Sequence, residues 1–240
     1  MRNLIRNVTI ILLLLCFSRI SFAADSTRVS FQKQNKKNRY ISLSFGMGVG
    51  YSNNQSLKQF IEYRVPNYGN IPESDKLTGF STGLEFFGGV ERQFAKNFSA
   101  RIEYAYFIKS MNSTNVIFNS YDFSYISHQP YLILNYIIPL EYSFLKFGAG
   151  AGYFFSIFKI REGSIENTYK SNSIGLKLEG VINLQISKNF AGYLSGFINK
   201  TFANDLKDKN DVDLVNVKGE KVNLSSFGVG LRLGVEVFIF

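Results

Sequence analysis

Apolar and polar residues alternate along most of the chain, and the alternation recurs in eight separate segments. In the first of them, Ile41, Leu43 and Phe45 alternate with Ser42 and Ser44. A side-chain period of two that continues over ten or more residues predicts a β-strand. We place the eight predicted strands at residues 40–51, 79–94, 98–110, 122–138, 144–160, 173–186, 190–202 and 223–240.

The predicted strands are long, and the breaks between them are alternately short and long. Strands of soluble proteins are commonly about 5–6 residues, whereas about 9–11 tilted residues cross a bilayer. Short turns on one side and longer loops on the other are typical of a transmembrane barrel. The sequence therefore predicts an all-β fold, an eight-stranded antiparallel up-and-down transmembrane β-barrel with both termini periplasmic. The longer breaks lie at 52–78, 111–121, 161–172 and 203–222.

The first residues of the chain have the composition of a secretory signal peptide. Arg2 and Arg6 precede the apolar run Val8–Phe17, and small residues at Ser21 and Ala23 fit a cleavage site. We therefore predict three parts: a signal peptide at 1–23, a flexible basic periplasmic tail at 24–39 and the barrel at 40–240. The single cysteine of the chain lies inside the predicted signal peptide, so the mature protein is expected to form no disulfide.

The polar face of the predicted strands carries full charges in mid-strand, flanked by glycine and serine. An eight-stranded barrel is just wide enough to be filled by its side chains, and buried charges are costly unless paired. We interpret this face as a lumen closed by an ionic plug, with a selective pore as the alternative. The predicted plug consists of Glu85, Glu91, Glu103, Glu179, Glu236, Arg101, Lys109, Lys146, Lys177 and Arg232. A three-residue turn at 95–97 would place Phe94 opposite Phe98 and Glu91 opposite Arg101.

Few residues suggest chemistry at a site. His128 is the only histidine, and no orienting carboxylate can be placed beside it for a hydrolase triad. The sequence does not decide whether His128 faces the lumen or the lipid. Counting from the next strand favours the lumen, whereas Leu132 and Leu134, which share its parity, favour lipid. The repeated glycines at 46–50 and 148–152 lack the strand-turn-helix context of a phosphate-binding loop. We expect no enzymatic activity, no cofactor and no metal site.

The chain resembles the small eight-stranded outer-membrane β-barrels of the OmpA type, especially the porin family proteins of Bacteroidota-like bacteria. The resemblance covers about residues 38–240 and rests on the signal peptide, the turn AKNF before residues 100–104, and the proline-bearing strand at 129–134. The terminal Phe240 resembles the signal read by the barrel-assembly machinery. That phenylalanine usually faces lipid in the family, whereas Phe240 shares parity with Arg232, which leaves the register of the last residues open.

These observations predict an integral protein of the bacterial outer membrane, with a structural, adhesive or binding role carried by its extracellular loops. The loops at 52–78 and 203–222, which carry aromatic and charged residues, are the candidate surfaces for an extracellular ligand. Expected partners are outer-membrane lipid, lipopolysaccharide and the barrel-assembly machinery, and a monomer is expected. Nucleic acid is not an expected partner, because the basic residues of the tail are not interleaved with aromatic ones. The alternatives are a small porin-like channel, an accessory of an envelope secretion or assembly system, and a lipid-modifying outer-membrane enzyme.

Overall fold

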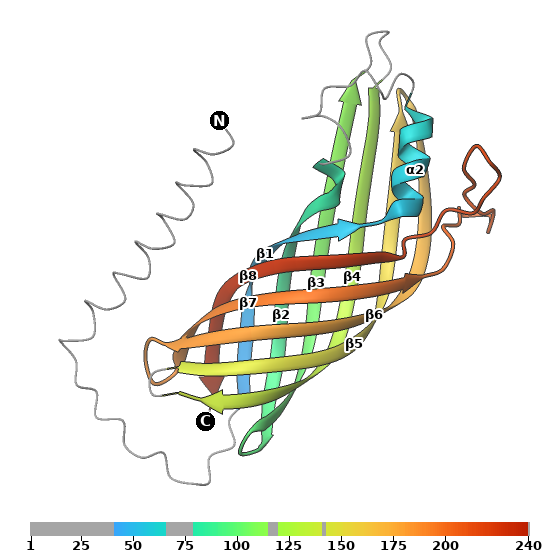
Figure 1. The fold of residues 1–240 in the computed structure, drawn as a ribbon. Helices are drawn as coiled ribbons and strands as arrows, with labels where there is room; N and C mark the ends of the chain where they lie inside the picture. The colour runs from blue at the N-terminus through green and yellow to red at the C-terminus, as the bar shows by residue number, and fades with distance from the viewer. Residues whose placement is uncertain (1–40, 66–78, 115–119, 141–142, 240) are drawn as a thin grey trace. The chain divides into compact units, whose positions relative to one another are not determined.

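The computed structural model describes residues 41–65, 79–114, 120–140 and 143–239. Eight strands pair antiparallel in chain order, and β1 closes the barrel against β8 (Figure 1). The eight-stranded antiparallel barrel predicted from the alternation is therefore confirmed. The predicted signal peptide and tail lie outside the described residues and stay predictions. The elements are β1 (Ile41–Asn53), α2 (Gln55–Arg64), the short 3-10 helix η3 (Gly79–Ser81), β2 (Thr82–Ala95), β3 (Phe98–Thr114), β4 (Ser120–Pro139), β5 (Ser143–Glu162), β6 (Ile165–Gln185), β7 (Phe190–Ala203) and β8 (Ser226–Ile239).

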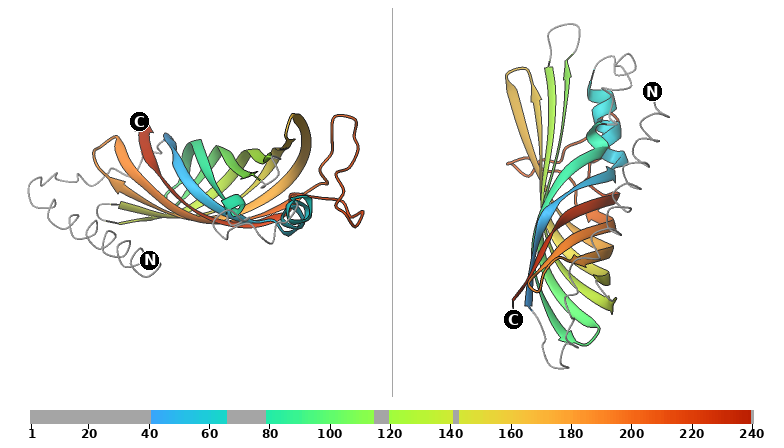
Figure 2. Two further views of the ribbon diagram at one scale, coloured as in Figure 1. Left: turned by 90° about the horizontal axis from the view of Figure 1, so that it is seen from above. Right: turned by 90° about the vertical axis from the view of Figure 1, so that its left-hand side faces the viewer.

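The strands are strongly tilted and curved, and the two ends of the barrel differ (Figure 2). One end carries α2 and residues 203–225 and is called the long-loop end. The other carries tight connections such as 96–97 and 186–189, together with the start of β1 and the end of β8, and is called the short-turn end.

The predicted loop at 161–172 is wrong, because β5 and β6 pair without a break up to Glu162 and Ile165. Their two-residue turn begins at Gly163, whose φ of 58° suits glycine in a tight hairpin turn. The alternation of apolar and polar residues fades here because both faces are polar, although the backbone ladder continues. Arg161 and Glu166 lie opposite each other, with 2.8 Å between Nη2 and Oε2. The hairpin therefore extends well beyond the roughly 9–11 residues that a bilayer crossing needs.

The outer face of the barrel is an apolar belt to which every strand contributes. Met47, Ile102 and Leu231 are each 60–69% exposed, far more than an apolar core residue would be. A soluble barrel turns its apolar face inward, so this arrangement is inverted and suits a lipid surround. Among the described residues, no helix is long and apolar enough to cross a membrane.

A row of aromatic side chains marks the belt near the short-turn end. Phe98 lies opposite Tyr136, and Tyr136 lies opposite Phe147 on the next strand. Phe94 stacks on Phe98 with ring centroids 6.4 Å apart. Aromatic girdles of this kind stand at the membrane–water boundary of transmembrane barrels. We therefore place the edge of the hydrocarbon layer at this row.

The seam between β1 and β8 is lined on the inside by glycine. Gly46 lies directly opposite Gly234, and Gly48 lies opposite Arg232. A Cβ atom on Gly46 would stand 2.1 Å from the carbonyl oxygen of Leu233. The two strands can approach because neither inner face carries a side chain at this level, and the free space accommodates the long Arg232 side chain.

Candidate functional site

All ten charged residues of the predicted plug lie on the inner face of the barrel, and each is at least nine-tenths buried. Nine of them form one connected set of ion pairs, and Lys109 lies apart. The nine are contributed by β2, β3, β5, β6 and β8, so the network crosses the lumen instead of following one wall. Its members are Glu85, Glu91, Arg101, Glu103, Lys146, Lys177, Glu179, Arg232 and Glu236.

Glu103 is the centre of the network. Its carboxylate oxygens lie 2.7 Å from Lys177 Nζ, 2.8 Å from Arg232 Nη1 and 3.0 Å from Arg101 Nη2. Glu179 contacts the same three cations. Two carboxylates therefore share three cations, an arrangement that offsets much of the cost of burying each charge.

Aromatic rings enclose these cations from the sides. The guanidinium carbon of Arg232 lies 4.6 Å from the ring centroid of Phe197 and 4.8 Å from that of Phe87. Lys177 Nζ lies 4.7 Å from the Tyr131 ring. The ring faces are partly negative, so they attract the cations while filling the lumen with carbon.

A second group of ion pairs lies toward the short-turn end. Lys146 Nζ is 2.9 Å from a carboxylate oxygen of Glu91 and 2.9 Å from one of Glu236. The Ser99 hydroxyl donates to Glu91 at 2.6 Å, and the Ser42 hydroxyl donates to Glu236 at 2.5 Å. One ammonium thus holds two carboxylates, with hydroxyl donors satisfying them further.

The predicted opposition of Glu91 and Arg101 agrees with the register of β2 and β3. Their ion pair is long, however, at 3.9 Å between Oε2 and Nη1. Arg101 turns toward Glu103 and Glu179 instead. The predicted three-residue turn at 95–97 is also wrong, because Ala95 pairs with Phe98 and the register shifts between Gln93 and Ala95.

Lys109 departs from the predicted plug. It lies nearer the long-loop end, where its ammonium donates to the Ser52 hydroxyl at 2.9 Å. It stands 4.8 Å from the Phe80 ring and 5.0 Å from the Tyr125 ring. The predicted plug contained five carboxylates and five cations. Without Lys109, the observed network has five carboxylates and only four cations, so its charges are not paired one to one.

Above Lys109, the interior of the barrel changes from ionic to apolar. Helix α2 and residues 203–225 are together called the cap. Inward side chains of β3, β4 and β5 pack against it here. Phe123 and Phe158 stack with ring centroids 6.2 Å apart and are fully buried. The cluster consists of Leu57, Phe60, Ile61, Val65, Phe80, Phe107, Met111, Phe123, Tyr125, Phe158, Ile160, Leu206, Leu214, Val222 and Leu224.

Local sequence explains why α2 forms inside the predicted loop 52–78. The Asn54 side chain accepts a hydrogen bond from the Leu57 N–H at 2.8 Å, which is an N-cap. Leu57, Phe60 and Ile61 follow at helical spacing and turn one face toward the cluster. Arg64 Nε then bonds Glu162 at 2.6 Å, tying the helix to the β5–β6 hairpin, and this hydrogen bond raises the pKa of Arg64. Residues 66–78 of the predicted loop lie outside the described residues.

The predicted loop at 203–222 lies between β7 and β8, and it folds on three aliphatic residues spaced eight apart. The Leu206 N–H donates to the Val222 carbonyl at 2.8 Å, Leu214 to Leu206 at 2.7 Å, and Val222 to Leu214 at 2.8 Å. The three backbones thus close a triangle, which is called the triad. Their side chains are buried in the apolar cluster, so both hydrogen bonding and packing fix the segment.

The turns between the members of the triad also repeat at an interval of eight. The side-chain oxygens of Asp208 and Asn216 each accept the backbone N–H groups two and four residues further on, at 2.7–3.0 Å. Three residues after each of them comes a residue with positive φ, Asp211 at 62° and Gly219 at 77°. Residues 206–213 and 214–221 are therefore two copies of one turn.

Ion pairs between the copies hold the outside of the segment. Lys221 Nζ lies 2.6 Å from Asp213 and 3.6 Å from Asp205. The hydrogen bond from Lys221 lowers the pKa of Asp213. Exposed pairs like these add little stability by themselves, so the aliphatic triad carries most of the order. Its spacing in an otherwise charged run is the sequence signal that could have revealed this fold.

His128 lies on the outer face of β4, which answers the question that parity left open. Its Nδ1 and the Tyr104 hydroxyl are 2.5 Å apart, and the Tyr106 ring centroid is 5.1 Å from its own. It therefore faces the lipid side among aromatic residues. At the end of the chain, β1 and β8 keep one register through Ile239, with Phe238 buried inside. Phe240 lies outside the described residues.

No protein-family model matches the sequence, and no curated protein matches it. Solved structures match in fold. A major outer membrane protein of Thermus thermophilus is 11% identical, with a TM-score of 0.49, over 83% of this chain and 99% of that one. Ail, the attachment invasion locus protein of Yersinia pestis, solved with the heparin analogue sucrose octasulfate, is 11% identical, with a TM-score of 0.46, over 85% and 100%. Such low identities concern the fold alone.

A third similar structure corrects one expectation. The outer membrane protease OmpT from Escherichia coli is 9% identical, with a TM-score of 0.42, and the match covers 85% of this chain and 98% of that one. The expectation that the chain is not an enzyme is therefore corrected: a protease is among the barrels it is similar to, so this fold does not speak against enzymatic activity. At this identity only the fold is shared, and the protease activity is not transferred.

Proposed function

We propose that the chain is an integral outer-membrane barrel with a filled lumen, which presents a prefolded binding surface to the cell exterior. The observation that carries the proposal is the cap, whose apolar packing on the barrel and hydrogen-bonded triad make the long-loop end a fixed surface. In this proposal the long-loop end is extracellular, both termini are periplasmic and residues 1–23 are removed on export. The protein acts as a monomer after insertion by the barrel-assembly machinery.

The contents of the lumen favour a binding role over the channel alternative. The ionic network crosses the middle of the barrel, and the apolar cluster fills the long-loop end above it. An ion moving through would have to part buried pairs and then enter an apolar layer, and both steps are costly. Transport through the lumen is therefore the weaker proposal.

Exposed apolar residues on the cap supply the proposed binding surface. Val212, Val215 and Val217 stand outside the triad and are 48–70% exposed, and Tyr63 of α2 is 57% exposed. The valines sit on or beside turns fixed by side-chain hydrogen bonds, and Tyr63 sits on a capped helix, so binding would cost little ordering entropy. We propose that this surface contacts a macromolecular ligand or an envelope partner outside the membrane.

Two exposed lysines at the edge of the cap support a position of this end of the barrel among lipopolysaccharide headgroups. Lys170 and Lys207 exchange two backbone hydrogen bonds, at 2.8 and 3.0 Å, so these residues lie directly opposite each other. Like charges opposed in a ladder are mildly destabilising. Both lysines are exposed, and Lys207 has the Asp211 carboxylate 3.9 Å away. Phosphate groups of the outer leaflet would further offset their repulsion.

The binding proposal is tested by photo-crosslinking from the cap in intact cells. A photoreactive phenylalanine analogue at Val217 should give a discrete adduct, while the same analogue at the lipid-facing Ile102 should give no protein adduct. A second variant carries the same analogue at Val217 together with Leu214→Asp. This change disrupts the cap because it buries an unpaired carboxylate in the apolar cluster. That change should abolish the adduct while the barrel still inserts.

Two outcomes would contradict the binding proposal. One is the absence of any adduct from Val217 when folded protein is at the cell surface. The other is an adduct that persists with Leu214→Asp, because the folded cap would then not be what binds. Identification of a periplasmic partner would reverse the proposed orientation.

A further inference from the structure

Lys109 is a buried lysine that pairs with no carboxylate among the described residues. It is 6% exposed, and no carboxylate of the described residues lies within 4 Å of its Nζ. Its polar partner is the Ser52 hydroxyl, which cannot carry the compensating charge. Removing an ammonium group from water is expensive unless an anion is close. Within the described part of the chain, the ammonium form of Lys109 therefore has no anion to neutralise it.

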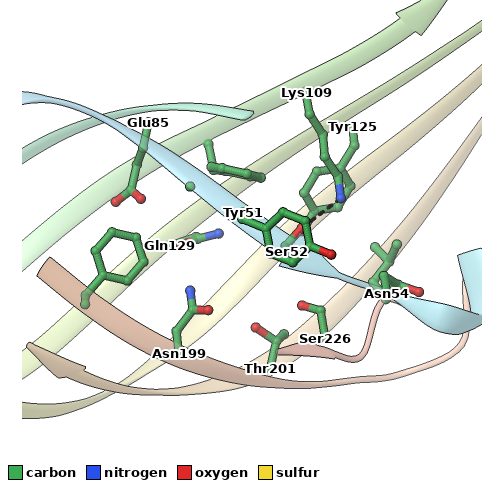
Figure 3. Close-up of a pocket in the computed structure, with 14 residues that line it drawn as sticks. Tyr51, Ser52, Asn54, Glu85, Lys109, Tyr125, Gln129, Asn199, Thr201 and Ser226 are labelled. Atoms are coloured by element: carbon green, nitrogen blue, oxygen red, sulfur yellow. Dashed lines mark hydrogen bonds between the residues drawn. The ribbon is translucent and has the colours of Figure 1, made fainter. Parts of the chain in front are cut away.

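The Lys109 side chain borders a small polar cavity below the cap (Figure 3). The cavity has a volume of about 30 Å³, and a neighbouring one of about 20 Å³ is also lined by Ser52, Asn54 and Lys109. A single water needs roughly 10–15 Å³ on this scale. The first cavity therefore has room for one small ion but little room for a tetrahedral oxyanion such as sulfate. Its polar lining includes Ser52, Asn54, Gln129, Asn199, Thr201 and Ser226.

Helix α2 adds a second positive feature at the same place. Asn54, its N-cap, lines both cavities, and Leu57 and Lys58 of its first turn line the smaller one. No acidic residue stands in that first turn. The N-terminus of a helix carries a partial positive charge and favours an anion. A lysine and a helix N-terminus facing the same cavity repel each other unless an anion lies between them.

The competing partner for Lys109 is Glu85, which lines the other side of the larger cavity. That carboxylate is already in direct contact with the Arg232 guanidinium. Glu85 also belongs to the network with one carboxylate in excess, so part of its charge could act on Lys109 across the cavity. This interpretation predicts no dependence on the nature of the anion, which makes it separable by experiment.

We propose that the cavity beside Lys109 binds one small monovalent anion of about the size of chloride. The Lys109 ammonium supplies the charge, and the Asn54 amide and the Ser226 hydroxyl are available as donors on the cap side. The bound anion links β3 of the barrel to the N-terminus of α2 and thereby fixes the cap. The inference is independent of what the cap binds.

Bromide diffraction of the intact protein gives the direct test. Crystals grown or soaked in sodium bromide should show an anomalous peak in this cavity, within hydrogen-bond distance of Lys109 Nζ. Water alone in the cavity, with bromide peaks only at the surface, would overturn the proposal and favour compensation by Glu85. This measurement needs no variant.

Thermal unfolding gives an independent test in solution. At matched ionic strength, chloride or bromide should raise the unfolding midpoint by a few degrees over gluconate or sulfate. The shift should grow with halide concentration as expected for a ligand that binds only the folded state. Lys109→Met should remove this halide effect, whereas Lys200→Met, a change on the outer face, should leave it intact. An equal halide response in wild type and Lys109→Met would contradict the site.

Discussion

Replacing Arg101 by glutamine should destabilise the folded barrel by about 3–5 kcal/mol, the cost typical of breaking a buried ion pair. Arg101 is fully buried and contacts three carboxylates, those of Glu91, Glu103 and Glu179. Its loss leaves these buried carboxylates with fewer cations to pair with. Urea unfolding followed by far-ultraviolet circular dichroism measures the change. Unfolding is also visible as altered mobility of unheated protein on denaturing gels.

Double-mutant cycles separate the partners of Arg101. The coupling energy between Arg101→Gln and Glu179→Gln should exceed that between Arg101→Gln and Glu91→Gln. The physical reason is distance, since the guanidinium contacts Glu179 directly but lies 3.9 Å from Glu91. Additive effects in both cycles would mean that these groups do not interact in the folded protein, and the network would have to be redrawn.

Gly46→Val should prevent the barrel from closing, with a loss of more than about 4 kcal/mol, in the range reserved for severe packing or backbone conflicts. The new Cβ would stand 2.1 Å from the Leu233 carbonyl oxygen and 2.6 Å from the Gly234 Cα. Both atoms belong to the backbone of β8, so no side-chain rotation relieves the clash. The two strands of the seam would have to separate, breaking the ladder that closes the sheet.

A matched glycine on the lipid side provides the control for this variant. A Cβ added to Gly180 would meet no atom within 4 Å, so Gly180→Val should fold as the wild type does. Folding of both is measured by the compact, heat-sensitive mobility of the unheated protein on gels. If Gly46→Val folds as efficiently as Gly180→Val, β1 and β8 do not meet in the register described.

The membrane-facing part of the fold could be predicted because successive residues of each strand face two different environments. Lipid outside and a polar lumen inside impose a period of two, so residues such as Leu231 and Arg232 reveal their faces by parity alone. Parity also put Glu91 and Arg101 on the inner face, and the assumed turn at 95–97 placed them opposite each other. Parity could not tell which carboxylate Arg101 would select, because that depends on strand tilt and on residues distant in the sequence.

Beyond the belt, the alternation no longer reports the fold. The β5–β6 hairpin continues into water, where Arg161 and Glu166 face outward and polar residues occupy both sides. In the cap, the informative period is eight, and Leu206, Leu214 and Val222 appear scattered among charged residues. Lys109 shares the parity of the plug residues but lies one layer higher, which only the three-dimensional register reveals. His128 lies on the outer face together with Leu132 and Leu134, as the parity of its own strand indicated, while the count from the next strand misled.

The proposal that the lumen is filled is tested most directly by the electrical conductance of the purified, folded protein in a planar lipid bilayer. With insertion verified by protection of the strands from protease in matching liposomes, we predict no steady open level at moderate voltage. We propose that the ionic network across the middle and the apolar cluster above it together block the passage of water and ions. Steady, ion-selective openings from the wild-type protein would contradict this account and make the chain a channel.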